Sequence, residues 1–168
     1  TLAAGALFLA GTVAAQAATQ FATIGTGGVT GVYYPVGGAI TKIINQKKDV
    51  YNIRATVEST GGSIFNVSAL MNGDIEFGIV QSDLQYQALK GFKDWEGKPQ
   101  TKLRAVFALH PEIVTIVADT EKNIKTAADL KGKVVNIGQP GSGQRANAPD
   151  LFFFFFKVER IEVDEDDS

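Results

Sequence analysis

Short apolar runs alternate along the chain with amphipathic stretches, and the loops after the apolar runs are rich in Gly, Ser and Thr. This order is typical of parallel strands connected by helices. The first two strands are expected at 21–24 and 53–57, and the first two helices at 35–46 and 63–72, with Gly73 as the C-cap of the second helix. The sequence therefore predicts an α/β fold with a parallel sheet.

The same alternation continues further along the chain. Ser82 or Asp83 is expected to cap a helix that ends near Lys90, and Thr126 is expected to cap a short helix at 127–130. Further strands are expected at 77–80, 103–109, 113–117 and 133–137.

The last part of the chain departs from this pattern. Pro149 falls where the helix after Gly143 is expected to continue, and proline costs roughly 3 kcal/mol inside a helix. The unbroken aromatic run at 152–156 has neither the helical nor the strand period, and acidic residues follow it. The segment 148–168 is therefore expected to be an aberrant tail, with a buried strand of phenylalanines as the alternative.

The composition excludes several classes of protein. The chain has no cysteine, which excludes disulfides and thiolate metal sites. Its 168 residues are 45% apolar, which suits a packed core, and a net charge of −2 without a Lys/Arg cluster argues against a nucleic-acid partner. No metal ion and no cofactor are expected, and the chain is expected to be a monomer.

The first residues have the composition of an export signal. Residues 2–15 carry no charge and are rich in Ala, Leu, Phe and Val, and Ala15-Gln16-Ala17 is a small-x-small cleavage pattern. This apolar run is too short to span a bilayer, which takes roughly 20 residues. A signal peptide at 1–17 and a periplasmic destination are expected, and a buried N-terminal helix is the alternative.

Four loops follow the expected strands and are candidates for ligand binding. In an open α/β sheet, ligands bind where the carboxyl ends of strands and the N-termini of helices meet. Backbone N–H groups and hydroxyls at such positions can hold a small anion, and a carboxylate is the expected ligand. Ser and Thr in these loops are as readily explained as N-caps. The loops are 25–34, 58–63, 81–83 and 139–144.

Two aromatic residues and one cation are further candidates. Tyr33 and Tyr34 precede Pro35, at the expected start of the first helix, where a ring could cover a ligand and a phenol could hydrogen-bond to it. Packing in the core is the alternative role for both. Arg145 follows the last glycine-rich turn and could pair with an acidic ligand, although solvation is its commoner fate.

The search for catalytic residues gives little. His110 is the only histidine, and Gly141-Ser142-Gly143 lacks the flanking residues of a nucleophile elbow. The glycines at 25–31 miss the G-x-G-x-x-G register at Thr30, and no acidic residue ends the second expected strand. The chain is therefore not expected to be an enzyme, and a nucleotide-dependent α/β enzyme is the weaker alternative.

These features together resemble the TAXI group of solute receptors, which serve tripartite ATP-independent periplasmic (TRAP) transporters. The similarity covers about 21–146. The residues that carry it are 24–28, 31–38, 58–63 with Asn66, 78–83, 103–107, 109–112, 129–133 and 138–145.

The resemblance implies a two-lobed periplasmic-binding fold that closes on its ligand and docks onto two membrane subunits, without chemistry on the ligand. Members bind glutamate-like amino acids or dicarboxylates. Carried onto this chain, the ligand would contact Gly27, Tyr33, Tyr34, Ser59, Thr60, Gly61, Gln81, Ser82 and Asp83 from the first lobe, and Gly141, Ser142, Gly143 and Gln144 from the second.

The resemblance also divides the chain. The first lobe of the solute-binding domain is expected at 18–111, with a candidate crossing at 110–112, and the start of the second lobe at 112–147. The tail at 148–168 does not resemble the continuation of the family, so the second lobe is expected to be truncated. A non-functional receptor fragment therefore stands as an alternative to a working receptor.

Overall fold

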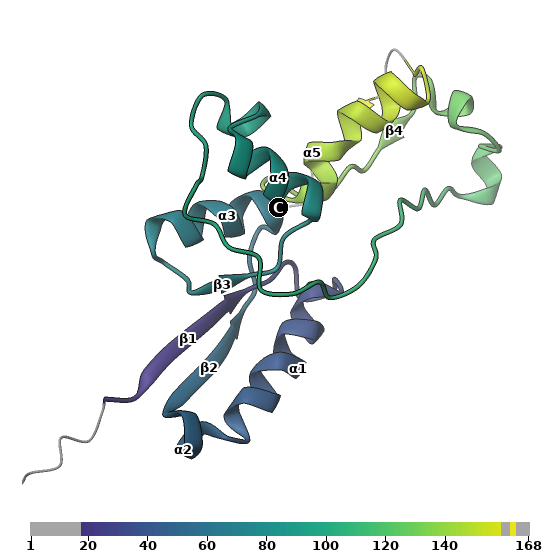
Figure 1. Cartoon of the computed structure of the whole chain (residues 1–168). Coiled ribbons are helices and arrows are strands. Elements are labelled where there is room, and N and C mark those ends of the chain that lie inside the picture. Colours follow the sequence, from purple (N-terminus) through teal and green to yellow (C-terminus); the bar gives the residue numbers. More distant parts are fainter. Residues whose placement is uncertain (1–17, 159–161, 164–168) are drawn as a thin grey trace, which may run out of the picture.

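The computed structural model describes residues 18–158 and 162–163, which form a mixed α/β structure (Figure 1). Its main sheet has three parallel strands in the order β2-β1-β3. The predicted α/β fold with a parallel sheet is therefore confirmed. The elements of this part are β1 (Gln20–Gly25), α1 (Tyr33–Asn45), α2 (Lys48–Tyr51), β2 (Ile53–Glu58), α3 (Ser63–Asn72) and β3 (Phe77–Gly78).

The crossover helices α1 and α3 cover the sheet. Since β2 and β3 lie on opposite sides of β1, right-handed crossovers place the two helices on opposite faces. Close packing of α1 depends on Gly37, where a Cβ would lie 2.5 Å from the Thr26 side chain. At the end of α1, the Asn45 amide donates to the Ala55 carbonyl at 2.8 Å and accepts from the Ala55 N–H at 2.9 Å. Both bonds fix α1 to an outer strand of the sheet.

The first core lies between α3 and α4 (Ser82–Lys90). Val67, Leu84 and Ala88 are almost completely buried there, and Trp95 packs against them from the short helix η1 (Lys93–Trp95). The core explains the role of the only tryptophan, which the sequence places in a polar loop. It also fixes the N-termini of α3 and α4 next to each other.

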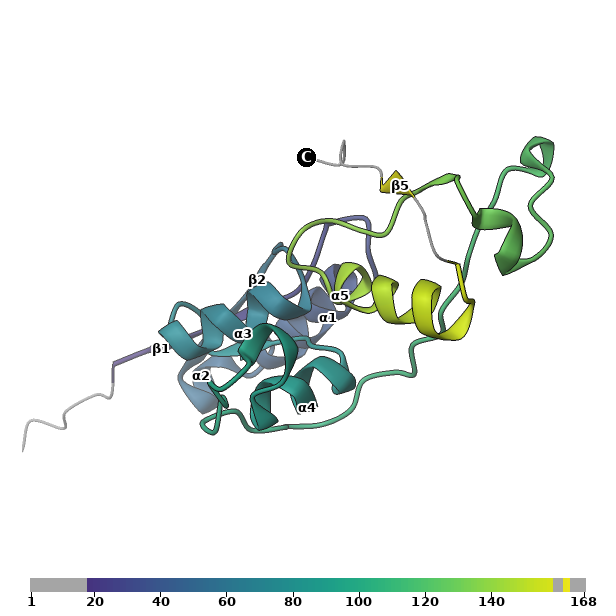
Figure 2. The ribbon, with the colours of Figure 1, turned by 90° about the horizontal axis from the view of Figure 1, so that it is seen from above.

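A second, smaller group of elements follows a long connecting segment (Figures 1 and 2). Its apolar centre is formed by Leu130, Ile137, Ala148 and Phe152. Its elements are η2 (Thr120–Lys122), η3 (Ala127–Leu130), α5 (Gly143–Pro149), the π-helix η4 (Asp150–Phe155), and the parallel pair β4 (Val134–Val135) and β5 (Glu162–Val163).

Most expected elements of the first part are confirmed. The bounds of α3 agree with the prediction, and Gly73 ends this helix with a φ of 82°. β3 is shorter than the expected 77–80, and β4 is shorter than 133–137. The expected cap of α4 is wrong: its N-cap is Gln81, and Ser82 and Asp83 are already helical.

The expected cap of η3 is confirmed. Thr126 and Asp129 form a capping box in which the Asp129 carboxylate accepts the backbone N–H of Thr126 at 2.8 Å. The backbone N–H groups of Lys125 and Thr126 stabilise the charged carboxylate, so they hold the pKa of Asp129 below its ordinary value. This box fixes the start of η3.

The strands expected at 103–109 and 113–117 are wrong. The segment is extended but pairs with no other strand within the described residues, and Ile113 and Val117 are 85% and 90% exposed. A strand needs a neighbour for its backbone groups and a surface for its side chains. The apolar runs in this segment indicated strands, but the sequence alone does not show whether a neighbouring strand is present to pair with them.

Pro149 does not interrupt the helical course of the chain that begins at Gly143. It is the last residue of α5, and the chain continues into the wider turns of η4, where the Phe156 N–H donates to the Leu151 carbonyl at 3.0 Å. Phe152 is buried, whereas Phe153 and Phe154 are exposed. The aromatic run is thus a helical turn with a buried side, and not the strand considered as the alternative.

The expected signal peptide at 1–17 lies outside the described residues. Within the part that the structure describes, no helix is long and apolar enough to cross a membrane.

Candidate ligand-binding site

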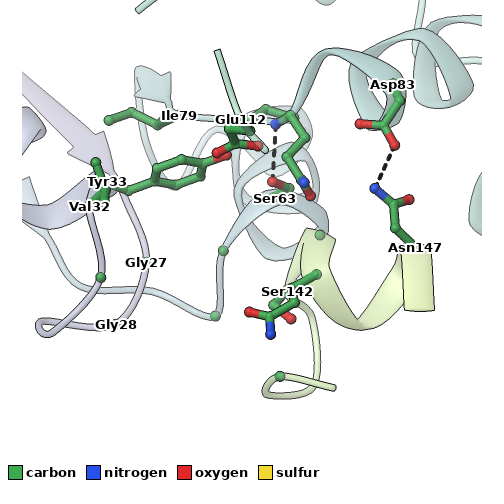
Figure 3. A pocket seen from close by; sticks show the side chains of 18 of the residues that line it. Gly27, Gly28, Val32, Tyr33, Ser63, Ile79, Asp83, Glu112, Ser142 and Asn147 are labelled. Atoms are coloured by element: carbon green, nitrogen blue, oxygen red, sulfur yellow. Dashed lines mark hydrogen bonds between the residues drawn. The ribbon is translucent and has the colours of Figure 1, made fainter. Parts of the chain in front are cut away.

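The candidate site lies where the loops after β1, β2 and β3 meet the loop before α5 (Figure 3). It occupies one end of an open hollow of about 2780 Å³, much larger than the roughly 300–1,000 Å³ of a small-molecule pocket. Most of the predicted ligand residues line this hollow. They are Gly27, Tyr33, Ser59, Gly61, Gln81, Ser82, Asp83, Ser142, Gly143 and Gln144.

A buried framework holds these loops together. Asn66 is completely buried, and its amide nitrogen donates to the carbonyls of Thr26 and Ile79 at 2.7 and 2.8 Å. Its amide oxygen accepts from the Thr60 hydroxyl at 2.7 Å. Thr26 is buried as well, and its hydroxyl donates to the Glu58 carbonyl at 2.5 Å. One asparagine therefore connects the ends of β1 and β3 and the loop after β2.

Several predicted ligand hydroxyls belong to this framework. The Ser59 hydroxyl donates to the Gly27 carbonyl at 2.9 Å, and Thr60 is bonded to Asn66. The Ser63 hydroxyl accepts from the Gln81 N–H at 3.1 Å, which fixes the start of α4 against the start of α3. These hydroxyls set the shape of the loops, in agreement with the structural role that sequence reasoning left open for them.

The N-terminus of α3 is occupied by the chain itself. The N–H groups of Ile64 and Phe65 both donate to the Gly141 carbonyl, at 3.0 and 3.3 Å. We expected this loop to present unpaired N–H groups to an anion, and for α3 that expectation is wrong. A carbonyl from the second group of elements takes the place of an anion at the positive end of the helix.

Further contacts join the two sides of the site. The Gln139 amide donates to the Thr60 carbonyl at 3.2 Å, and the Asn147 amide donates to the Asp83 carboxylate at 2.7 Å (Figure 3). Gly143 packs so closely that a Cβ would meet the Gln81 side-chain oxygen. The loop before α5 therefore lies directly on the starts of α3 and α4.

Tyr33 projects from the start of α1 towards Glu112 and Ser63 (Figure 3). Burial raises the pKa of its phenol above the ordinary value, and hydrogen bonding to the negative Glu112 carboxylate raises it further. The ring also meets His110 edge to face, with centroids 6.1 Å apart. His110 Nε2 lies 3.9 Å from a Glu112 oxygen. The phenol of Tyr33 therefore lies among the Ser63 hydroxyl, the Glu112 carboxylate and the His110 ring.

Some predicted residues are not part of the wall. Within the described residues, Tyr34, Thr60 and Gly141 do not line the hollow, although the last two help to shape it. Arg145 donates to the Gly138 carbonyl at 3.5 Å, which keeps its guanidinium at the turn before α5. The Ser142 hydroxyl accepts from the Arg145 N–H at 3.1 Å and serves as the N-cap of α5.

Sequence reasoning missed Glu112 and Asn147 as site residues. Ser63 and Gln139 lie within the candidate loops 58–63 and 139–144, but neither was named as a ligand residue. Glu112 comes from a segment that was expected to be a break between strands, and nothing local indicates that it reaches Tyr33. Gln139 and Asn147 act across the site, and such contacts become visible only when both sides are placed.

The match to known proteins agrees with this geometry. Residues 24–165, most of the chain, match the NMT1-like family. The chain belongs to the NMT1-like family. This family is periplasmic-binding-protein-like, so its members are proteins of the solute-binding type. The match includes both groups of elements and the helical turn at 152–156.

The NMT1-like family is a family of binding proteins, so membership indicates a small-molecule ligand and an extracytoplasmic location. Across the described ranges 18–158 and 162–163, no group of three or more His, Cys, Asp or Glu side chains could hold a metal ion. The site is built from backbone groups, hydroxyls, amides, one phenol and two carboxylates.

Proposed function

We propose that the protein is the extracytoplasmic receptor of a TRAP-type transporter, of the TAXI group. It captures a small carboxylate, such as glutamate or a dicarboxylate, and delivers it to the membrane subunits. The observation that supports this most is the meeting of three βα loops and the loop before α5 around Tyr33. In a solute-binding-type protein, a polar cleft of this kind is where the ligand binds.

The proposed receptor has a first lobe at 18–111 and the start of a second lobe at 112–147. Two separate apolar centres support two lobes, one between α3 and α4 and one around Leu130 and Phe152, and the second centre extends beyond residue 147. Contacts between the lobes come from Gln139, Gly141 and Asn147. A ligand between the lobes would touch both, which is how hinge closure buries a solute.

The ligand shell proposed from the sequence keeps its wall residues. Gln81, Ser82 and Asp83 come from the start of α4, which has no side-chain cap. Gly143 and Gln144 face them from the first turn of α5. First-turn N–H groups at these two helices would donate hydrogen bonds to a ligand carboxylate.

Thermal unfolding of the full chain with and without ligand tests the proposal. The panel is millimolar glutamate, glutamine, succinate and glutarate. A ligand at 100 times its Kd stabilises the fold by about 2.7 kcal/mol, which shifts the midpoint by several degrees. Tyr33→Ala should abolish the shift, whereas Tyr86→Ala, an exposed tyrosine on α4, should keep it. A midpoint that none of these compounds moves would contradict the proposal.

A further inference from the structure

Two acidic side chains act on the phenol of Tyr33. The Glu112 carboxylate lies beside the Tyr33 hydroxyl (Figure 3), and the charge of Asp83 also acts on this group. Asp83 is held by the Asn147 amide at 2.7 Å, whereas the neighbours of the Glu112 carboxylate among the described residues are the Tyr33 hydroxyl and, at 3.9 Å, the His110 ring nitrogen. A ligand next to Tyr33 therefore meets a carboxylate that can still accept hydrogen bonds.

The Lys and Arg side chains that line the hollow either bond to backbone carbonyls or are exposed. The Arg104 guanidinium donates to the carbonyls of Thr101 and Leu103, both at 2.8 Å. Lys102 lies on the connecting segment and Lys122 in η2, and both side chains are exposed. Among the described residues, none of these three cations pairs with Tyr33 or Glu112, so none is placed to balance a second acidic group of a ligand there.

The N-terminus of α3, whose partial positive charge could have replaced a cation, is also occupied. The first-turn N–H groups of α3 donate to the Gly141 carbonyl. The positive end of α3 therefore does not compensate the charges of Glu112 and Asp83. A free carboxylate placed beside Tyr33 would be repelled by Glu112, because like charges at short range in a partly desolvated site are strongly unfavourable.

We propose that Glu112 is a specificity-determining residue that selects a ligand bearing an ammonium group, such as an amino acid, over a dicarboxylate. An ammonium has three donors and no acceptor, so it can donate to the Glu112 carboxylate and to the Tyr33 hydroxyl oxygen. The ammonium group can also bind over the face of the Tyr33 ring through a cation–π interaction. This inference rests on the proposed function.

Isothermal titration of the full chain with L-glutamate and with glutarate tests the inference. Glutarate has the same carbon chain and two carboxylates but no ammonium group. The native chain should bind glutamate at least tenfold more tightly than glutarate. Glu112→Gln, which keeps the size of the side chain, should remove most of this preference by weakening glutamate binding. The control Glu96→Gln, an exposed acid outside the hollow, removes the same charge and should keep the preference.

The outcomes separate the two proposals. Equal or tighter binding of glutarate to the native chain overturns the role of Glu112 and leaves the receptor function standing. A preference that survives in Glu112→Gln overturns it as well. If no compound of the panel binds, the proposed function fails and the inference fails with it. The native comparison needs no variant, so a folding defect of Glu112→Gln cannot hide the answer.

Discussion

At the scale of single residues, Asn66 has the most consequences for the site. Its side chain is completely buried and makes three hydrogen bonds, to Thr26, Ile79 and Thr60. A buried carbonyl that loses its donor costs about 1–3 kcal/mol, whereas an exposed side chain usually changes stability by less than about 0.5 kcal/mol. The shape of three ligand loops therefore depends on one amide.

Asn66→Ala should lower the free energy of unfolding by about 3 kcal/mol, because two carbonyls and one hydroxyl lose their partner. Asn72→Ala, at the exposed end of α3, is the matched control and should stay within about 0.5 kcal/mol of the native chain. Urea unfolding followed by far-UV circular dichroism measures both. Equal effects of the two substitutions would contradict the role assigned to Asn66.

Tyr33 makes the stability dependent on pH in alkaline solution. Its pKa in the folded chain is raised above the unfolded value of about 10, mainly by burial and then by Glu112. The folded state therefore keeps a proton that the unfolded state loses, so stability is fully present below pH 10 and falls as the pH rises further. Urea midpoints between pH 8 and 11 should fall less steeply in Tyr33→Phe. The same slope in Tyr33→Phe and in the native chain would count against this explanation.

At the scale of elements, the start of α5 and the loop before it lie on the starts of α3 and α4. The Gly141 carbonyl accepts two N–H groups of α3, and Asn147 donates to Asp83 on α4. A Cβ at Gly143 would collide with the side chains of Gln81 and Leu84. Three contacts of different kinds thus hold one element in place.

Gly143→Ala should push α5 away from Gln81 and break the bonds from Ile64 and Phe65 to Gly141. Hydrogen exchange at these two amides should then become at least tenfold faster, because their acceptor moves away. Gly38→Ala is the control: nothing lies within 4 Å of a Cβ there, and alanine favours the helix α1. Unchanged exchange at Ile64 and Phe65 in Gly143→Ala would show that the contact is not fixed by close packing.

Local signals in the sequence predicted the elements around the site well. Pro35 and the apolar spacing indicated α1, and Gly73 marked the end of α3, because helix ends and periods are written in neighbouring residues. The strands at 103–109 and 113–117 failed because pairing depends on distant residues. The glycine-rich loops were placed correctly because their signals are local. The contact of the α3 N-terminus with Gly141 and that of Glu112 with Tyr33 were missed because both depend on distant residues.

At the scale of the whole molecule, the two groups of elements are joined by an extended segment (Figure 1). Several apolar side chains of this segment are exposed. Val106 and Phe107 are 67% and 64% exposed, and Ile113 and Val117 are more so. Contiguous exposed apolar surface favours association. The stability of each group instead comes from its own apolar centre.

Replacing both Ile113 and Val117 with Ser should therefore leave the unfolding midpoint almost unchanged, because neither side chain packs against a core. The same change should lower the binding of a hydrophobic dye and the light scattering of concentrated samples, since the segment loses apolar surface.

Val67→Ser provides the opposite control for this double substitution. Val67 is 1% exposed in the first core. Serine there would lose the packing of the valine methyl groups and bury a hydroxyl without a hydrogen-bond partner, so the chain should be destabilised by about 2–4 kcal/mol. If the double substitution lowered the midpoint as much as Val67→Ser does, the segment would have to be packed against the rest of the molecule in solution. The two groups of elements would then depend on the segment for stability, and not only for their connection.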